Sequence, residues 1–342
     1  PRNVPAVAAN SFDHIFSVGQ NGLSGVAAVR DRGVALTYSG NDYTTVTALR
    51  TASILSGRYS TARNFGLIRT SQAPVGELTV DPVENATRTA AATAGRVLQR
   101  AGLVSGVDFL PADIAALDAL NAAEVGYWVG TSETTALQVV SDILNSIGAA
   151  IVPDRTGVFR MFRLDDPSAK TPLMTLSEDE ILEPGTRGVE RLATGDQGKG
   201  VPAWQVTVNY AQNYTVMRKA DLDQVNTPAA FKTFAQEEWR KAVAKDEAVK
   251  ARHLLATELT FNTWLMTEAA AQAEANRRLA LHSVGRDRFK VPVKSRFVEA
   301  VDIGSIVALQ MNRFGLQAGK SFAVIGIAEN FQTGITTLDL WG

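Results

Sequence analysis

The sequence contains no cysteine, and this absence excludes several classes of site. Disulfide bonds and cysteine-based zinc or redox centres are excluded in all 342 residues. The three histidines, His14, His253 and His282, are far apart, and none has a second histidine three or four positions away. Because metal-binding helices supply such pairs, we predict no metal site and no cofactor, and we interpret the histidines as ordinary surface or interface residues.

The chain also lacks an excess of charge and long apolar runs. It has 34 Lys and Arg against 35 Asp and Glu, which gives a formal net charge of −1. Affinity for nucleic acid comes largely from cations that neutralise phosphates, so the composition gives no argument for specific nucleic-acid binding. No apolar run approaches the ~20 residues that a membrane-spanning helix needs, and no signal-peptide pattern is visible. We therefore predict no transmembrane segment.

Catalytic motifs are missing as well. The Gly-x-Ser-x-Gly motif of many hydrolases is absent. Glu178 and Glu180 belong to an acidic cluster, and a glycosidase needs two carboxylates that flank the scissile bond. Neighbouring residues of one turn point in different directions, and they serve the helix dipole equally well. Asp221 and Asp223 lack the other ligands of a calcium loop. We therefore predict no catalytic residue and no enzymatic activity.

The strongest positive pattern lies in the last forty residues. Segments 305–310, 321–329 and 335–341 alternate apolar and polar residues and are separated by Gly- and Asn-bearing connections, which predicts three antiparallel strands. Segment 315–321 (GLQAGKS) looks like a phosphate-binding loop, but it has three residues where that motif has four. A β-patterned segment follows it, so no helix N-terminus is available for a phosphate. We interpret it as a hairpin connection.

The remaining pattern mixes helices and strands. The predicted helices are 86–100, 111–120, 133–146 (capped by Thr131 or Ser132), 231–243 and 268–281. The predicted strands outside the C-terminal segment are 24–30, 34–38, 65–69, 77–80, 125–129, 150–153, 158–164, 203–210, 254–264 and 289–293. Residues 1 to about 20 are predicted to form an extended arm. Arg277, Arg278 and Arg286 surround the end of a helix, where cations are favoured, and are interpreted as a solvated face.

These elements predict an α+β protein with three units. Residues 1–85 form an arm and a partial β unit, and residues 86–186 form a small α+β unit. Residues 187–342 form a β-barrel-like unit with a helical insertion at about 228–285.

Five stretches carry a resemblance to a known family. They are GVAAVRDRGVALTYSGNDYTTV, YSTARNFGLIRTSQAPVGELTVD, GVFRMFRLDDP, VPAWQVTVNYAQNYTV and IGSIVALQMNRFGLQAGKSFAVIGIAENFQTGITTLDLWG. In pattern and order they resemble bacteriophage tail tip and baseplate hub proteins of tailed phages. The likeness extends over most of residues 20–342. Members of that family are typically longer at the N-terminus, so the resemblance implies that further residues precede Pro1.

The resemblance implies a structural virion protein at the distal end of the tail. Such proteins are usually homotrimers whose β domains form a ring that closes the tail tube and contacts other tail proteins, such as tube, tip or fibre proteins. The resemblance also implies assembly in the bacterial cytoplasm and a final location in the virion. Two alternatives stay open: a tail-associated cell-wall hydrolase that uses Glu178 or Glu180, and a host-binding adhesin that uses Tyr127, Trp128 and Tyr210.

Overall fold

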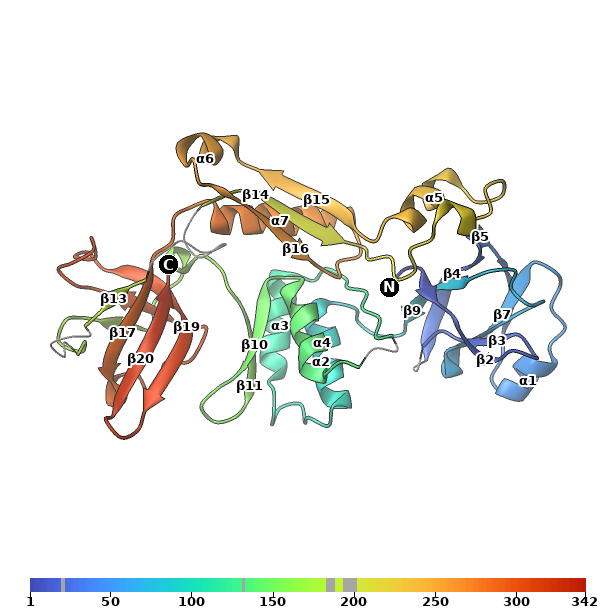
Figure 1. Ribbon diagram of the computed structural model, residues 1–342. Helices are drawn as coiled ribbons and strands as arrows, with labels where there is room; N and C mark the ends of the chain where they lie inside the picture. Colours follow the sequence, from blue (N-terminus) through green and yellow to red (C-terminus); the bar gives the residue numbers. More distant parts are fainter. Residues whose placement is uncertain (20–21, 131–132, 183–187, 193–201) are drawn as a thin grey trace.

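The computed structural model describes residues 1–19, 22–130, 133–182, 188–192 and 202–342, and it shows an elongated molecule (Figure 1). Two sheets made by N-terminal residues lie at one end, and a six-stranded sheet made by C-terminal residues lies at the other. A helical unit lies between them. A three-stranded sheet with a long helix runs above this unit and links the two ends.

The N-terminal residues form two sheets, with strand orders β1-β9-β4-β5 and β2-β3-β8-β7-β6. The elements are β1 (Val4–Pro5), β2 (Val7–Asn10), β3 (Ile15–Ser17), β4 (Leu23–Asp31), β5 (Val34–Ala35), β6 (Thr37–Asp42), α1 (Val46–Thr51), β7 (Arg58–Ala62), β8 (Leu67–Thr70) and β9 (Leu78–Glu84). The predicted strands 24–30 and 34–38 are confirmed as β4 and as β5 with β6, and β4 pairs with β5 in a hairpin. The prediction of an extended arm at residues 1–20 is wrong, because Val4 and Ile15 are buried and their strands pair within the sheets.

The helical unit contains α2 (Ala90–Arg100), α3 (Pro111–Leu120), α4 (Ala136–Asn145), β10 (Ala149–Pro153) and β11 (Phe159–Arg163). Helix α4 begins later than predicted because the hydroxyl of Thr135 accepts a hydrogen bond from the backbone N–H of Gln138. The predicted caps Thr131 and Ser132 lie outside the described residues. The predicted strand at 125–129 is wrong, since this segment forms only an isolated bridge between Val125 and Leu265.

The three-stranded sheet has the order β15-β14-β16, and helix α7 covers one of its faces. Its elements are β14 (Ala203–Tyr210), β15 (Arg240–Lys245), β16 (Thr257–Asn262), α7 (Glu268–His282) and the connecting helices α5 (Ala229–Gln236) and α6 (Glu247–Arg252). The predicted helix 231–243 is wrong beyond Gln236. Ala242 and Ala244 are buried while Lys241 and Lys245 are exposed, and this period of two produces an edge strand.

The C-terminal sheet has the order β12-β18-β19-β20-β17-β13. It contains β12 (Met174–Leu176), β13 (Glu190–Arg191), β17 (Arg288–Lys294), β18 (Ile306–Leu309), β19 (Lys320–Asn330) and β20 (Ile335–Trp341). The prediction of three terminal strands is confirmed. The predicted barrel is not formed by the described residues, where each sheet is open. Val206 and Val208 of β14 pack in the core of α7 and the helical unit, so β14 does not share a core with the terminal strands.

Arg155, in the turn between β10 and β11, joins the helical unit to the C-terminal sheet. Its Nη1 donates to the carbonyl oxygens of Val298 (2.9 Å) and Glu299 (3.0 Å). Its Nη2 lies 2.9 Å from a carboxylate oxygen of Glu329 on β19. One guanidinium therefore binds β19 and two carbonyl oxygens of the connection between β17 and β18.

A buried ion network joins α7 to the helical unit. The side chain of Glu274 is fully buried, and Oε1 lies 2.7 Å from Nη2 of Arg277 and 2.6 Å from Nε of Arg278. Arg278 also donates to the carbonyl oxygen of Asn145 at the end of α4, and Arg277 donates to that of Leu164 at 3.2 Å. The carboxylate therefore positions both cations that reach across to the helical unit.

We expect Glu274→Gln to destabilise the protein strongly, because Arg278, whose side chain is only 4% exposed, would lose its anionic partner. Removing one member of a buried ion pair costs about 3–5 kcal/mol, which urea denaturation would measure as a lower free energy of unfolding. The control is Glu268→Gln on the exposed first turn of α7, with an expected change of about 0.5 kcal/mol or less. Equal losses in the two variants would contradict this role of Glu274.

Candidate functional site

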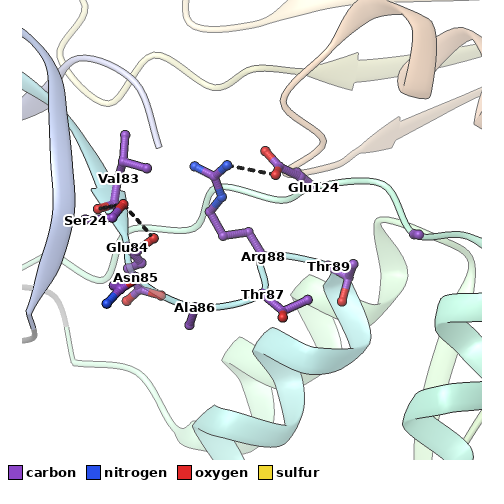
Figure 2. Close-up of a pocket in the computed structure, with 10 residues that line it drawn as sticks. Ser24, Val83, Glu84, Asn85, Ala86, Thr87, Arg88, Thr89 and Glu124 are labelled. Carbon is purple, nitrogen blue, oxygen red and sulfur yellow. Dashed lines mark hydrogen bonds and ion pairs between the residues drawn. The ribbon is translucent and has the colours of Figure 1, made fainter.

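A pocket of about 440 Å³ opens where the N-terminal sheets meet the helical unit (Figure 2). The chain from Val83 to Thr89 lines it, together with Ser24, Ala122 and Glu124. This segment leaves strand β9 and enters helix α2, which begins here because the hydroxyl of Thr89 accepts a hydrogen bond from the backbone N–H of Ala92. The pocket therefore lies at a joint between two parts of the fold.

Charged side chains of this pocket are paired with one another or with neighbours. Arg88 Nη2 lies 2.8 Å from Glu124 Oε1, as Figure 2 shows, and Arg96 Nη2 lies 3.3 Å from Glu84 Oε2. The hydroxyl of Ser24 lies 3.1 Å from the carbonyl oxygen of Glu84, to which it donates. The Ser24 hydroxyl therefore bonds to backbone carbonyl oxygens, and Glu84 and Glu124 each pair with an arginine. These ion pairs connect β9 to α2, and the segment before α2 to the segment between α3 and α4.

The three histidines lie in different parts of the structure. His14 is in the turn between β2 and β3, His253 follows α6, and His282 ends α7. Within the described ranges, no group of three or more His, Asp or Glu side chains is placed to hold a metal ion. None of the described helices combines the length and hydrophobicity required to span a bilayer.

The carboxylates considered for hydrolysis are engaged in local turns. Glu178 accepts a hydrogen bond from the backbone N–H of Asn312 at 2.7 Å. Glu180 accepts hydrogen bonds from the hydroxyl of Ser177 at 2.5 Å and from its backbone N–H at 2.8 Å. These bonds lower the pKa of Glu180 below its ordinary value, with the hydroxyl bond as the largest cause. A general acid needs a raised pKa, so Glu180 is poorly suited to that role.

Segment 315–321 and the acidic residues near 221 also form turn structures. Lys320 begins β19, and its Nζ lies 3.1 Å from an oxygen of Asp287 and 3.2 Å from the carbonyl oxygen of Gly342. The interpretation as a hairpin connection is confirmed by the pairing of β18 with β19. Asp221 accepts from the backbone N–H of Arg218, and Asp223 accepts from the backbone N–H groups of the two residues at 225–226.

The aromatic residues considered for host binding serve mainly in packing. The hydroxyl of Tyr127 donates to Asp142 at 3.1 Å, and its ring centroid lies 4.9 Å from that of Trp264. Burial, assisted by the charge of Asp142, raises the pKa of Tyr127 to about 12. The ring of Trp128 lies 5.5 Å from Tyr214, edge to face. These contacts connect the segment before α4 with α4 itself and with the segments that follow β14 and β16. Tyr210, at the end of β14, is half-buried and packs against the same core.

Sequence reasoning missed a joint that involves His282 and the C-terminal strand. The imidazole lies between the rings of Phe261 (6.3 Å) and Trp341 (6.4 Å). Arg286 lies over the ring of Trp341 and pairs with Asp166 at 3.0 Å. Burial, and then the charges of neighbouring arginines, lowers the pKa of His282 to about 4. The sequence signal that could have predicted this joint is a histidine at the end of a predicted helix, together with Arg286 and with Trp341 near the end of the chain.

Comparison with known proteins gives likenesses of structure. No family model and no curated protein sequence matches the chain. A chain in the virion of the native gene transfer agent particle is 12% identical, with a TM-score of 0.54, covering 96% of this chain and 77% of that one. The chain therefore shares its fold with a virion protein. The resemblance predicted from the sequence is confirmed at the level of the fold.

Two tail proteins are also similar, with lower scores. The tail protein from Neisseria meningitidis MC58 is 16% identical, with a TM-score of 0.43, and the match covers 78% of this chain and 74% of that one. The 43 kDa tail protein of prophage MuSo2 from Shewanella oneidensis is 12% identical, with a TM-score of 0.42, and the match covers 82% and 74%. Both TM-scores are below 0.5, so these two likenesses support no conclusion about this chain.

We expect His282 to make stability depend on pH. The unfolded chain takes up a proton below the ordinary pKa of 6.5, whereas the folded chain does so only near pH 4, so stability is lost as the pH falls between these values. His282→Phe keeps a ring between Phe261 and Trp341 but does not titrate. Urea denaturation at pH 7 and 4.5 should show about 2 kcal/mol less acid destabilisation in this variant. An identical pH dependence in both proteins would contradict the assignment.

Proposed function

We propose that the chain is a non-enzymatic structural protein of the tail of a phage or phage-like particle. In this role it forms the hub that closes the distal end of the tail tube and connects the tube to tip or fibre proteins. The observation that carries the proposal is the shared fold with a chain of the gene transfer agent virion, which extends over 96% of this chain. The commitment of Glu178, Glu180, Tyr127 and Trp128 to internal contacts supports it.

The open sheets support assembly with further copies. In the described residues, β15 and β16 each pair with β14 alone, and β2 and β6 form the edges of the five-stranded sheet. Unpaired strand edges present backbone N–H and C=O groups that another strand can bind. Most homo-oligomers have closed rotational symmetry, in which such edges meet around an axis. We therefore propose a homotrimer that forms a ring.

The face of the three-stranded sheet opposite α7 carries polar side chains, of which Thr207 and Asn209 at its centre are buried, and this face supports the proposal of a ring. Gln205, Thr207 and Asn209 of β14 face away from α7, beside Lys241 and Glu258 on the two neighbouring strands. A sheet with one apolar and one polar face is typical of a wall between protein and water. We also propose that each chain of this assembly consists of three units, residues 1–85, 86–186 and 187–342. The assembly forms in the host cytoplasm and functions in the virion.

We expect light scattering of the purified protein to give a mass near 110 kDa, which is three times the chain mass of 36.6 kDa. Electron cryomicroscopy of the intact particle should place the chain at the distal end of the tail, because a hub closes the tube there. Density for the chain only in the capsid would refute the tail role. A monomer in solution and in the particle would refute the ring while leaving the tail role in place.

A further inference from the structure

An exposed phenylalanine stands at the tip of the C-terminal sheet. Phe331 lies in the turn between β19 and β20 and is 89% exposed. In Figure 1 this turn is at the lower end of the six-stranded sheet, away from the three-stranded sheet. Water contact with a large aromatic side chain is unfavourable, and burying it in a partner would recover about 25 cal/mol for each Å² removed from water.

The turn that carries Phe331 is held in one conformation. Oδ1 of Asn330 accepts hydrogen bonds from the backbone N–H groups of Gln332 (3.1 Å) and Thr333 (3.2 Å). On the other side, the carbonyl oxygen of Gly334 accepts from the backbone N–H of Ser295 at 3.0 Å. The base of the hairpin is fixed because Glu329 pairs with Arg155 of the helical unit. A side chain presented on a rigid turn loses little conformational entropy when it binds.

Positive charge flanks the same turn. Lys294 pairs in register with Ile335, and both Lys294 and Arg296 are exposed. The guanidinium of Arg296 lies 4.8 Å from the ring centre of Phe297. Within the described part of the chain, neither cation forms an ion pair, whereas the carboxylate of Glu329 is already paired with Arg155. The surface around Phe331 is therefore apolar at its centre and cationic at its margin.

We propose that Phe331 inserts into an apolar pocket with an acidic rim on a neighbouring protein of the particle. The inference rests on the proposed tail function and adds the contact that attaches the hub to its neighbour. The aromatic side chain supplies the affinity, because buried aromatic residues dominate the energetics of interfaces. Lys294 and Arg296 select the partner, because complementary charge at an interface margin mainly sets specificity and the association rate.

The chain offers a matched control at its other end. Phe12 is 86% exposed, and it also stands in a hairpin turn held by an Asn side chain, since Asn10 accepts from the backbone N–H of Asp13. Here the neighbouring charges neutralise each other, because Arg50 pairs with Asp13 at 2.5 Å. Phe331 and Phe12 are therefore similar in exposure and in turn structure. They differ in that the cations beside Phe331 form no ion pair with a described residue, whereas the cation beside Phe12 does.

The test compares Phe331→Ser, Phe12→Ser and the double variant Lys294→Glu, Arg296→Glu in the full chain. Each is produced with the other particle genes, and quantitative mass spectrometry counts copies of the chain per purified particle. We expect a loss of about tenfold or more for Phe331→Ser, a clear loss for the double variant, and the wild-type level for Phe12→Ser. Melting temperatures of the purified variants should equal that of the wild type, because all four side chains are exposed.

The outcomes separate this inference from the proposed function. Absence of the wild-type chain from particles would overturn both. A normal copy number for Phe331→Ser, with the wild type present, would overturn the docking role alone. Equal losses for Phe331→Ser and Phe12→Ser would overturn the assignment to this turn, and a normal copy number for the charge variant would overturn the acidic rim.

Discussion

The buried carboxylate of Glu274 is the contact on which the arrangement of the parts depends. Helix α7 packs one face on β14 and β15, and its arginines reach the helical unit on the other side. Burying the charges of Glu274 and Arg278 and half-burying that of Arg277 is unfavourable, and the cost is offset only when each charge meets its partners with good geometry. Arg278 meets this condition through its hydrogen bond to the carbonyl oxygen of Asn145, at the end of α4. The network therefore favours one position of α7 relative to the helical unit over positions in which the helix is shifted along it.

The other joints in the molecule follow the same rule. The helical unit shares one apolar core with β14, β15 and α7, whereas the N-terminal and C-terminal sheets have cores of their own. Directional polar contacts add to the apolar ones where these parts meet. Arg155 binds the C-terminal sheet, and Asn3, which is fully buried, donates from Nδ2 to Asn213 Oδ1 and to the carbonyl oxygen of Thr215, both at 2.8 Å. Apolar contacts tolerate sliding, whereas hydrogen bonds and ion pairs do not. These polar contacts therefore help to fix the parts of the elongated chain relative to one another.

Local pattern predicted the elements whose causes are local. The C-terminal strands follow from alternation, and α3 follows from Pro111 at its first turn. The interpretation of Arg277 and Arg278 as a solvated face is wrong, because both pair with the buried Glu274, from which they are three and four residues away in the sequence. Their burial depends on Asn145, which is 133 residues from Arg278, and no local pattern contains that contact. Likewise, the strand at 240–245 exists because β14 offers an edge to pair with.

The candidate surfaces were harder to predict, because their properties appear only once the sheets are formed. Strand β15 is an edge, and its exposed positions carry Lys241 and Lys245, with Val243 between them. Lysines on an edge hinder random pairing with other strands, since like charges would then lie side by side. The opposite edge, β16, exposes Glu258. An edge with lysines repels an identical edge and attracts an acidic one. In the proposed assembly, the same charges that hinder random pairing therefore restrict which strand can pair with β15.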